Sequence, residues 1–240
     1  MSKNWRDKEH ARTITGRDKN ITVVDDHQYA ILVWAELAAQ LIKPPVLVSI
    51  DYHPDTDPPF WLWATQKAIA KDPEREECLK KQFQDQKLAA IDPLALESLE
   101  VQMSFMNNDE QINTAMALGF LSDYHMINCM AKHQYATGHH YLVPRASFGD
   151  LSDEMFVRAG FSLSLLPQNG PVFLDIDLDY FPDPASFQTA GSVFRSLVNQ
   201  AVGITIARSD KYFDYLKQTK KFTLGNCETA CIQLIHECSV

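Results

Sequence analysis

The chain has 240 residues, 45% of them hydrophobic and 22% charged, which is ordinary for a globular protein with a sizeable core. The formal net charge of −9 argues against a surface dedicated to nucleic acid, which needs clustered Lys and Arg. It does not exclude a cationic substrate, which an acidic pocket would favour. No apolar run approaches the ~20 residues that span a bilayer, and the polar start does not resemble a signal peptide, so we expect a cytoplasmic protein that does not bind membranes.

Short apolar runs alternate with helical patterns along the chain. Strands are predicted at 21–24, 46–50, 141–143, 171–174 and 203–207. Helices are predicted at 29–42, 109–121, 189–202, 211–220 and 228–237, and 61–131 is interpreted as mostly helical. Such alternation indicates an α/β fold with three α/β/α layers and a mainly parallel central sheet. We expect one domain over residues 1–240, with a polar lead-in at 1–20.

Three of the predicted strands end in groups of Asp and His. The strand 21–24 leads into Asp25-Asp26-His27, and the strand 46–50 leads into Asp51-Tyr52-His53-Pro54-Asp55. The strand 171–174 leads into Asp175-Ile176-Asp177-Leu178-Asp179. Ligands of such sheets bind outside the carboxyl ends of the strands. The three groups are therefore expected to meet in one site.

The spacing within these groups is typical of metal ligands. An extended segment places Asp51, His53 and Asp55 on one side, because side chains alternate along it. Two carboxylates and an imidazole suit Mn²⁺, Zn²⁺ or Fe²⁺ better than Ca²⁺. The acids that begin at Asp175 repel one another unless a cation, a basic side chain or water compensates them. A solvated loop, or a helix cap at Asp25-Asp26-His27, is the alternative explanation.

The order of these segments resembles the metal-ligand order of the ureohydrolase superfamily, which contains arginases, agmatinases and histone-deacetylase-like enzymes. The matching residues are His27, then Asp51-x-His53-x-Asp55, then Asp175-x-Asp177. Asp25, Tyr52 and Leu178-Asp179 depart from the arginase pattern and are similar to a narrower subgroup. Some bacterial members of that subgroup are peptide arginases, which convert arginine side chains of a ribosomally made precursor peptide to ornithine and release urea.

The resemblance implies an enzyme with two Mn²⁺ ions and a hydroxide that bridges them and attacks the guanidinium carbon. One ion would be bound by His27, Asp51, Asp55 and Asp175, and the other by Asp51, His53, Asp175 and Asp177. Asp55 would also accept a hydrogen bond from the hydroxide and relay its proton. Asp179 would lie beside the ligands, or become one if the register shifts by two residues.

Two further roles of arginases have no clear counterpart in the sequence. A proton-shuttle histidine would follow the Asp51 segment, and His125 and His139 are the candidates, with a structural role as the alternative. A guanidinium-binding acid would follow a late strand, where Asp210 stands next to Arg208. Further candidate substrate contacts are Asn108 and Glu110, for which helix capping is the alternative.

The expected partner is an arginine-containing precursor peptide, and a homo-oligomer is left open. Agmatinase-like or deacetylase-like hydrolysis of another amine derivative is the first alternative. A calcineurin-like phosphoesterase is the second, although Cys227 stands where such enzymes have a metal-binding histidine. A non-catalytic metal-binding protein is the third.

Overall fold

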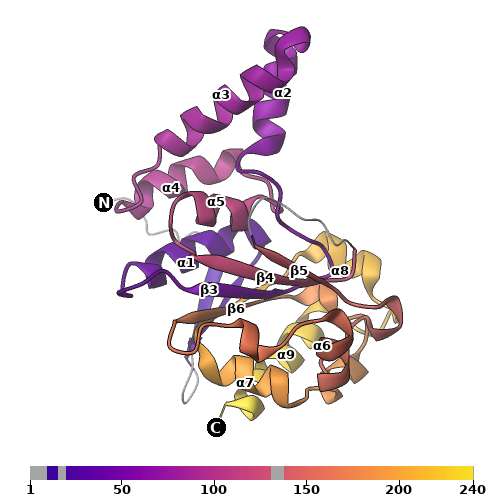
Figure 1. The fold of residues 1–240 in the computed structure, drawn as a ribbon. Helices are drawn as coiled ribbons and strands as arrows, with labels where there is room; N and C mark the ends of the chain where they lie inside the picture. The colour runs from indigo at the N-terminus through magenta and orange to yellow at the C-terminus, as the bar shows by residue number, and fades with distance from the viewer. Residues whose placement is uncertain (1–9, 16–19, 131–137, 240) are drawn as a thin grey trace.

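The computed structural model describes residues 10–15, 20–130 and 138–239 (Figure 1). Within them a seven-stranded sheet has the order β1-β2-β7-β6-β3-β4-β5. The strands are β1 (Ala11–Thr15), β2 (Asn20–Val24), β3 (Val46–Ile50), β4 (Asp123–Asn128), β5 (His139–Leu142), β6 (Val172–Asp177) and β7 (Ala201–Ala207). Only β1 is antiparallel to its neighbour; the other described strand pairs are parallel.

Helices cover both faces of the sheet, which confirms the predicted α/β fold with three layers (Figure 1). Their bounds are α1 (Ala30–Ala38), α2 (Trp61–Lys71), α3 (Glu76–Ala89), α4 (Leu96–Gln102), α5 (Gln111–Ala117), α6 (Asp153–Ala159), α7 (Ser192–Gln200), α8 (Asp210–Leu216) and α9 (Leu224–Cys238). Helices α1, α4 and α5 lie on one face, and α6, α7 and α9 on the other (Figure 1). Within the described ranges, every helix is too short or too polar to traverse a membrane.

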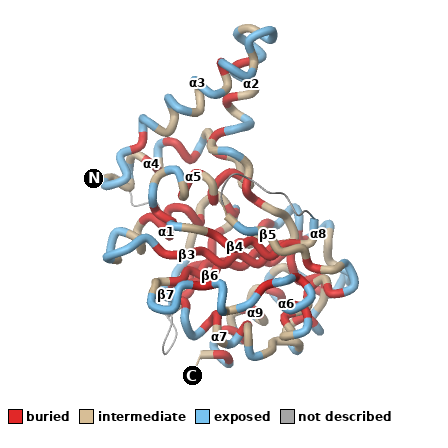
Figure 2. Tube along the Cα trace, viewed as in Figure 1, coloured by how far each residue is buried: buried red, intermediate tan, exposed pale blue. Residues whose placement is uncertain are grey.

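The sheet separates two hydrophobic cores because successive side chains of a strand point to opposite faces. In β3, Leu47 packs in the core beneath α1, whereas Val48 and Ile50 pack in the core beneath α7 and α9. All five residues of β3 are buried, and the central strands form the buried layer of Figure 2. This two-sided burial is the reason that the strand appears as an uninterrupted apolar run in the sequence.

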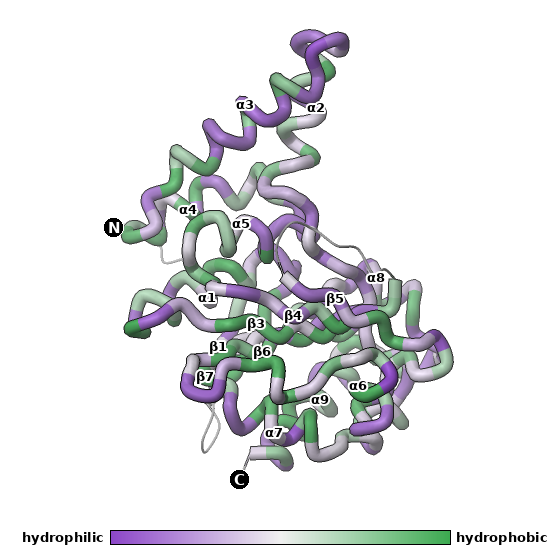
Figure 3. Tube along the Cα trace, in the orientation of Figure 1, coloured by the Kyte–Doolittle hydropathy of each residue, from purple (hydrophilic) through white to green (hydrophobic). Residues whose placement is uncertain are grey.

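Helices α2 and α3 form a hairpin that projects from the body, and hydrophilic residues predominate along α3 (Figure 3). Trp63 packs edge-on against Phe83 and Phe105, with ring centroids 5.9 and 5.6 Å away. The ammonium of Lys87 lies 3.1 Å from the centroid of the Phe105 ring. The hairpin is therefore fixed at its base by an aromatic cluster and a cation–π contact.

Strand boundaries are where the structure departs most from the sequence-based expectation. Strand β4 lies within the stretch 61–131 that was interpreted as mostly helical, and β1 lies within the predicted lead-in 1–20. The rest of that lead-in, residues 1–9 and 16–19, lies outside the described residues. Strand β6 continues to Asp177, so that Asp175 is inside the sheet rather than beyond its end.

Candidate metal centre

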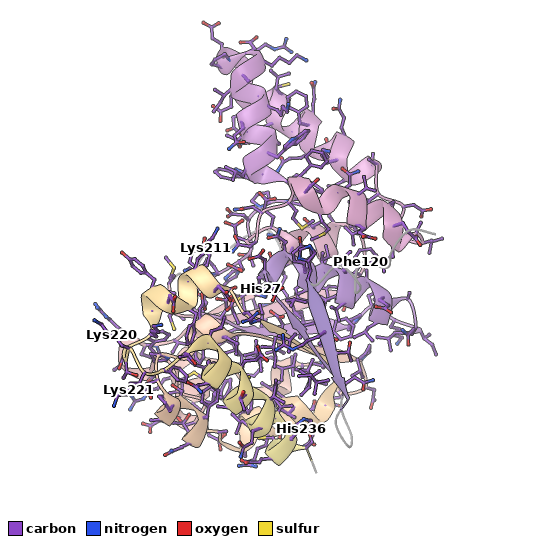
Figure 4. The ribbon with its side chains drawn as sticks, turned by 180° about the vertical axis from the view of Figure 1, so that it is seen from behind. His27, Phe120, Lys211, Lys220, Lys221 and His236 are labelled. Carbon is purple, nitrogen blue, oxygen red and sulfur yellow. The ribbon has the colours of Figure 1, made fainter. Side chains whose placement is uncertain are left out.

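The Asp and His groups meet at the carboxyl ends of neighbouring strands β2, β7, β6 and β3. His27 begins a short 3-10 turn after β2, and the residues from Asp51 to Asp55 follow β3. Asp177 ends β6, and Asp179 lies in the 3-10 turn that follows. Figure 4 shows His27 inside the molecule, while Lys211, Lys220 and Lys221 project from its surface.

One candidate metal-binding group surrounds the Nδ1 atom of His27. This atom lies 2.8 Å from an oxygen of Asp55 and 3.3 Å from oxygens of both Asp51 and Asp177. All four residues are buried, and one imidazole nitrogen with three carboxylate oxygens is a suitable ligand set for Mn²⁺ or Zn²⁺.

A second candidate group adjoins the first. The Nδ1 atom of His53 lies 2.8 Å from Oδ2 of Asp179 and 3.8 Å from Oδ1 of Asp51. Asp51 belongs to both groups: its Oδ2 faces His27 in the first group, and its Oδ1 faces His53 in the second. The arrangement therefore has room for two cations that share the Asp51 carboxylate.

Asp175, which was expected to bridge two ions, belongs to neither candidate group and lies behind His27. Its Oδ2 accepts hydrogen bonds from Nε2 of His27 (2.7 Å) and the hydroxyl of Ser49 (2.8 Å). Its Oδ1 accepts a hydrogen bond from the hydroxyl of Thr205. Ser49 and Thr205 are its register partners on β3 and β7. Asp175 thus orients His27, as carboxylates behind metal-binding histidines do.

Asp177 and Asp179 each belong to one of the two candidate groups, where Asp175 and Asp177 were expected. Oδ1 of Asp177 accepts the N–H of Asp179 (3.0 Å), and its Oδ2 accepts the hydroxyl of Ser209 (2.6 Å). Oδ1 of Asp179 accepts the N–H of Tyr52 at 3.3 Å. The cause of the two-residue shift is the length of β6, which keeps Asp175 within the sheet.

Two buried carboxylate oxygens provide a test of whether the residues fit a cation. Oδ2 of Asp51 and Oδ2 of Asp179 make no hydrogen bond of acceptable geometry in the described part of the chain, although a histidine Nδ1 lies 3.3 Å and 2.8 Å away, respectively. Leaving a charged oxygen buried without a partner is costly, and a divalent ion would remove that cost. In addition, Asp55 and Ser209 have positive φ angles of 39° and 43°, a strain that non-glycine residues often carry at functional sites.

The pKa values of the candidate ligands also indicate that the site lacks positive charge. Burial, followed by the charge of Asp177, raises the pKa of Asp179 to about 6. Burial and three neighbouring carboxylates raise the pKa of Asp51 well above its ordinary value. Burial alone would lower the pKa of His27 and of His53, but the surrounding carboxylates raise both. Protons therefore supply the compensating charge unless cations replace them.

Metal-free protein should consequently lose stability as the pH rises. A group whose pKa is higher in the folded state favours folding while it is protonated there, and this contribution is lost as the pH rises through the raised pKa. For Asp179 the loss is complete just above about 6, and for His27 and His53 it continues above 6.5. Bound cations would replace these protons.

We expect the Tm difference between Mn²⁺-loaded and EDTA-treated protein to grow by roughly 5 °C from about pH 5.5 to 8, measured by calorimetry. A difference that shrinks with pH would contradict this assignment.

Removal of the Thr205 hydroxyl should weaken metal binding, although this hydroxyl would not itself contact the ions. Thr205→Val loses the hydrogen bond to Asp175 that fixes the carboxylate behind His27. We expect metal affinity to fall by about 10- to 100-fold, measured by isothermal titration calorimetry. Thr22→Val is the control, because Thr22 is the register partner of Thr205 on β2 and its hydroxyl lies beside Thr13. An equal loss in both variants would refute the role of Thr205.

A pocket of about 170 Å³ opens above the two groups. Its walls contain, besides ligand candidates, the residues Pro54, Thr56, Asp57, Asn108, Asp109, Met130, Ser209 and Tyr212. Asn108 is thus placed at the pocket, as expected. Asp57 and Asp109 were not expected there; the N–H of Asp57 donates to the carbonyl oxygen of Asp109 (2.8 Å), which ties the two segments together. Burial, Asp55 and Asp57 raise the pKa of Asp109.

The two other predicted substrate contacts do not line this pocket, although Asp210 lines a neighbouring hollow. The carboxylate of Glu110 is buried and accepts the N–H groups of Leu62 (2.8 Å) and Asn107 (3.0 Å), so it fixes the start of α2. The side chain of Asp210 is 68% exposed and lies 4.0 Å from Arg208. Arg208 is itself compensated by Asp25 at 3.0 Å and therefore does not oppose a cationic substrate.

The histidines proposed as proton shuttles are not brought to the pocket. His125 pairs in register with Val48, three residues before Asp51, and points to the face of the sheet that carries Phe161. Burial and the nearby His139 lower the pKa of His125 to about 4. His139 is its register partner on β5. Both therefore lie toward the amino ends of their strands, away from the metal centre.

Three segments superficially match a calcineurin-like phosphoesterase: Asp51-Tyr52-His53, residues 149–153 and residues 225–228. The first lies in the centre, whereas the other two do not belong to either candidate group. The carboxylate of Asp150 accepts from Ser152, and that of Asp153 accepts from Ser192 and Val193. Cys227 is buried in α9 with its thiol directed at the carbonyl of Leu178. This alternative therefore keeps only the first of its three ligand segments at the centre.

Comparisons with known proteins give a likeness to solved structures but none to a protein-family model. No protein-family model and no curated protein matches the sequence. Among solved structures, the chain is similar to proclavaminate amidino hydrolase from Streptomyces clavuligerus, with 13% sequence identity and a TM-score of 0.48. The similarity covers 91% of this chain but 63% of that protein, so the chain spans less than two thirds of its length.

Proposed function

We propose that this protein is a metal-dependent amidino hydrolase that cleaves the guanidinium group of peptidyl arginine to give ornithine and urea. The observation that carries the proposal is the pair of ligand groups that share Asp51 at the base of an acidic pocket. The order of the segments along the chain, which resembles that of arginases, supports the same reaction class.

His27, Asp51, Asp55 and Asp177 would hold one divalent ion, and Asp51, His53 and Asp179 the other. We propose Mn²⁺, because imidazole and carboxylate ligands suit it. When bound, the ions would lower the pKa of water so that hydroxide is available at neutral pH. Asp55 lies at the pocket, and Gln111 holds its Oδ2 at 3.3 Å, so Asp55 is positioned to accept a proton from an attacking water.

The pocket is suited to a cationic head group. Asp57 and Asp109 add negative charge beyond the ligand set, and a guanidinium offers only hydrogen-bond donors to such oxygens. Its volume of about 170 Å³ is below the range of whole drug-sized ligands and fits the end of a side chain. A larger hollow of about 570 Å³ shares Asn108, Ser209 and Tyr212 with it. This hollow would accommodate the rest of a peptide.

The experiment that tests this function is incubation of Mn²⁺-loaded protein with an arginine-containing peptide and, separately, with free arginine and agmatine. Urea is measured colorimetrically, and the peptide is measured by mass. We expect urea release from the peptide, with arginine converted to ornithine. Urea from agmatine alone would make agmatine the substrate in place of the peptide, whereas no turnover of any of these compounds would overturn guanidine hydrolysis.

Asp109→Asn should weaken recognition of the substrate more than it slows the reaction. Loss of one carboxylate removes a charged hydrogen-bond acceptor for the guanidinium, worth about 1.5–3 kcal/mol. We therefore expect KM to rise by roughly 10- to 100-fold with two metal ions still bound. Asp214→Asn, at an exposed position of α8 that lines neither the pocket nor the larger hollow, is the control and should leave KM within about twofold. Unchanged KM in Asp109→Asn would remove this residue from the recognition site.

A further inference from the structure

Another cluster of metal-ligating side chains lies near the amino ends of β4 and β5, whereas the metal centre lies at the carboxyl ends of the neighbouring strands. Asp123 and His125 stand two residues apart on β4, so their side chains leave the strand on the same face. His139 is the register partner of His125 on the edge strand β5 and shares that face. Three ligand-type residues from two neighbouring strands therefore converge.

The distances between these side chains are already close to those of a ligand set. Nε2 of His139 lies 3.2 Å from Oδ2 of Asp123. The rings of His125 and His139 have centroids 4.9 Å apart, and one ligand atom from each of the three residues lies within 4.8 Å of the other two. Ligands of a single ion with bonds near 2.1 Å are at most about 4 Å apart, so small side-chain rotations would complete the set.

The surroundings prepare His125 for this role. Its Nδ1 lies 2.8 Å from the hydroxyl of Tyr141, which leaves Nε2 as the nitrogen available to an ion. Metal-binding histidines commonly have their second nitrogen fixed by such a partner. The His125 ring is buried against Tyr141 and Phe161, whereas the side chains of Asp123 and His139 are 37% and 55% exposed. One ligand is thus rigid, and the other two are accessible from solvent.

We propose that Asp123, His125 and His139 bind one Zn²⁺ ion at a site separate from the metal centre. Two imidazoles and a carboxylate suit Zn²⁺, and three protein ligands leave one position for water. The ion would join the edge strand β5 to β4 and thereby strengthen the end of the sheet. This inference does not depend on the proposed amidino hydrolase function, because none of its residues belongs to that centre.

The test uses a background in which the metal centre is disabled by Asp51→Asn and Asp177→Asn. Zn²⁺ bound after dialysis against micromolar Zn²⁺ is counted by mass spectrometry of the metal, and Tm is recorded with and without Zn²⁺. We expect one ion per chain and a Zn²⁺-dependent rise in Tm. Both should disappear on addition of His139→Ala or, as a second variant at an exposed position, Asp123→Asn.

His140→Ala is the matched control, since this neighbouring histidine points to the other face of β5, toward Tyr124. It should keep the ion. The proposal is overturned if the background protein binds no Zn²⁺, if His139→Ala binds as much as the background, or if His140→Ala loses the ion equally. Circular dichroism establishes that each variant is folded, so that a lost ion is not a lost fold.

Discussion

Asp179→Asn is expected to lose one of the two metal ions and nearly all activity. Asp179 contributes a buried oxygen to the group with Asp51 and His53, and that oxygen lies 2.8 Å from Nδ1 of His53. An amide there removes the charge that would attract the ion. Because metal activation of water is worth several kcal/mol, we expect kcat/KM for urea release to fall by about 1,000-fold. Bound Mn²⁺ should fall from two ions per chain to one.

Asp175→Asn distinguishes a ligand set with Asp177 and Asp179 from the set with Asp175 and Asp177 that was expected from the sequence. In the structure Asp175 supports His27 from behind, so its amide variant should keep two ions with affinity about 10- to 100-fold weaker. If Asp175 instead bridged the ions, Asp175→Asn would lose both and Asp179→Asn would lose neither. Counting Mn²⁺ in the two variants side by side therefore decides which aspartates are ligands.

Glu110→Ala is expected to destabilise the fold strongly while leaving metal binding intact. The carboxylate is fully buried and accepts two backbone N–H groups, from Leu62 and Asn107, which join the start of α2 to the wall of the pocket. Alanine would leave both donors buried without partners and a cavity beside them. We expect a loss of about 2–4 kcal/mol in the free energy of unfolding, measured by urea denaturation with Mn²⁺ stoichiometry as the second readout.

The exposed Glu97 in α4 provides the comparison, and Glu97→Ala should change the free energy of unfolding by less than about 0.5 kcal/mol. Burial raises the pKa of Glu110 to about 7, so its carboxyl favours folding when protonated and this contribution is lost as the pH rises through 7. A variant of Glu110 that is fully stable but binds substrate poorly would restore its predicted role as a substrate contact.

The sequence was sufficient to predict the architecture and the meeting of three strand ends. The apolar runs at 46–50 and 203–207 lie within β3 and β7 because these strands are buried on both faces, which leaves few polar positions to obscure them. Strand β4 was missed because it lies within a long stretch of helical pattern and is only six residues long.

The finer details of the site depend on where strands end, which the sequence does not specify to within two residues. Three aspartates at period two after the run 171–174 are equivalent as a pattern, and only the length of β6 separates Asp175 from Asp177 and Asp179. Ser49 and Thr205 were not detected, because a hydroxyl within a strand is part of no motif. Asp57 and Asp109 come from separate segments that only the fold brings together.

The most direct test of the metal centre is a crystal structure of Mn²⁺-loaded protein with anomalous diffraction at the manganese edge. Two anomalous peaks are predicted: one within bonding distance of His27, Asp51, Asp55 and Asp177, and one within bonding distance of Asp51, His53 and Asp179. Absence of peaks among these side chains, or ions coordinated by Asp175 in place of Asp179, would contradict the assignment.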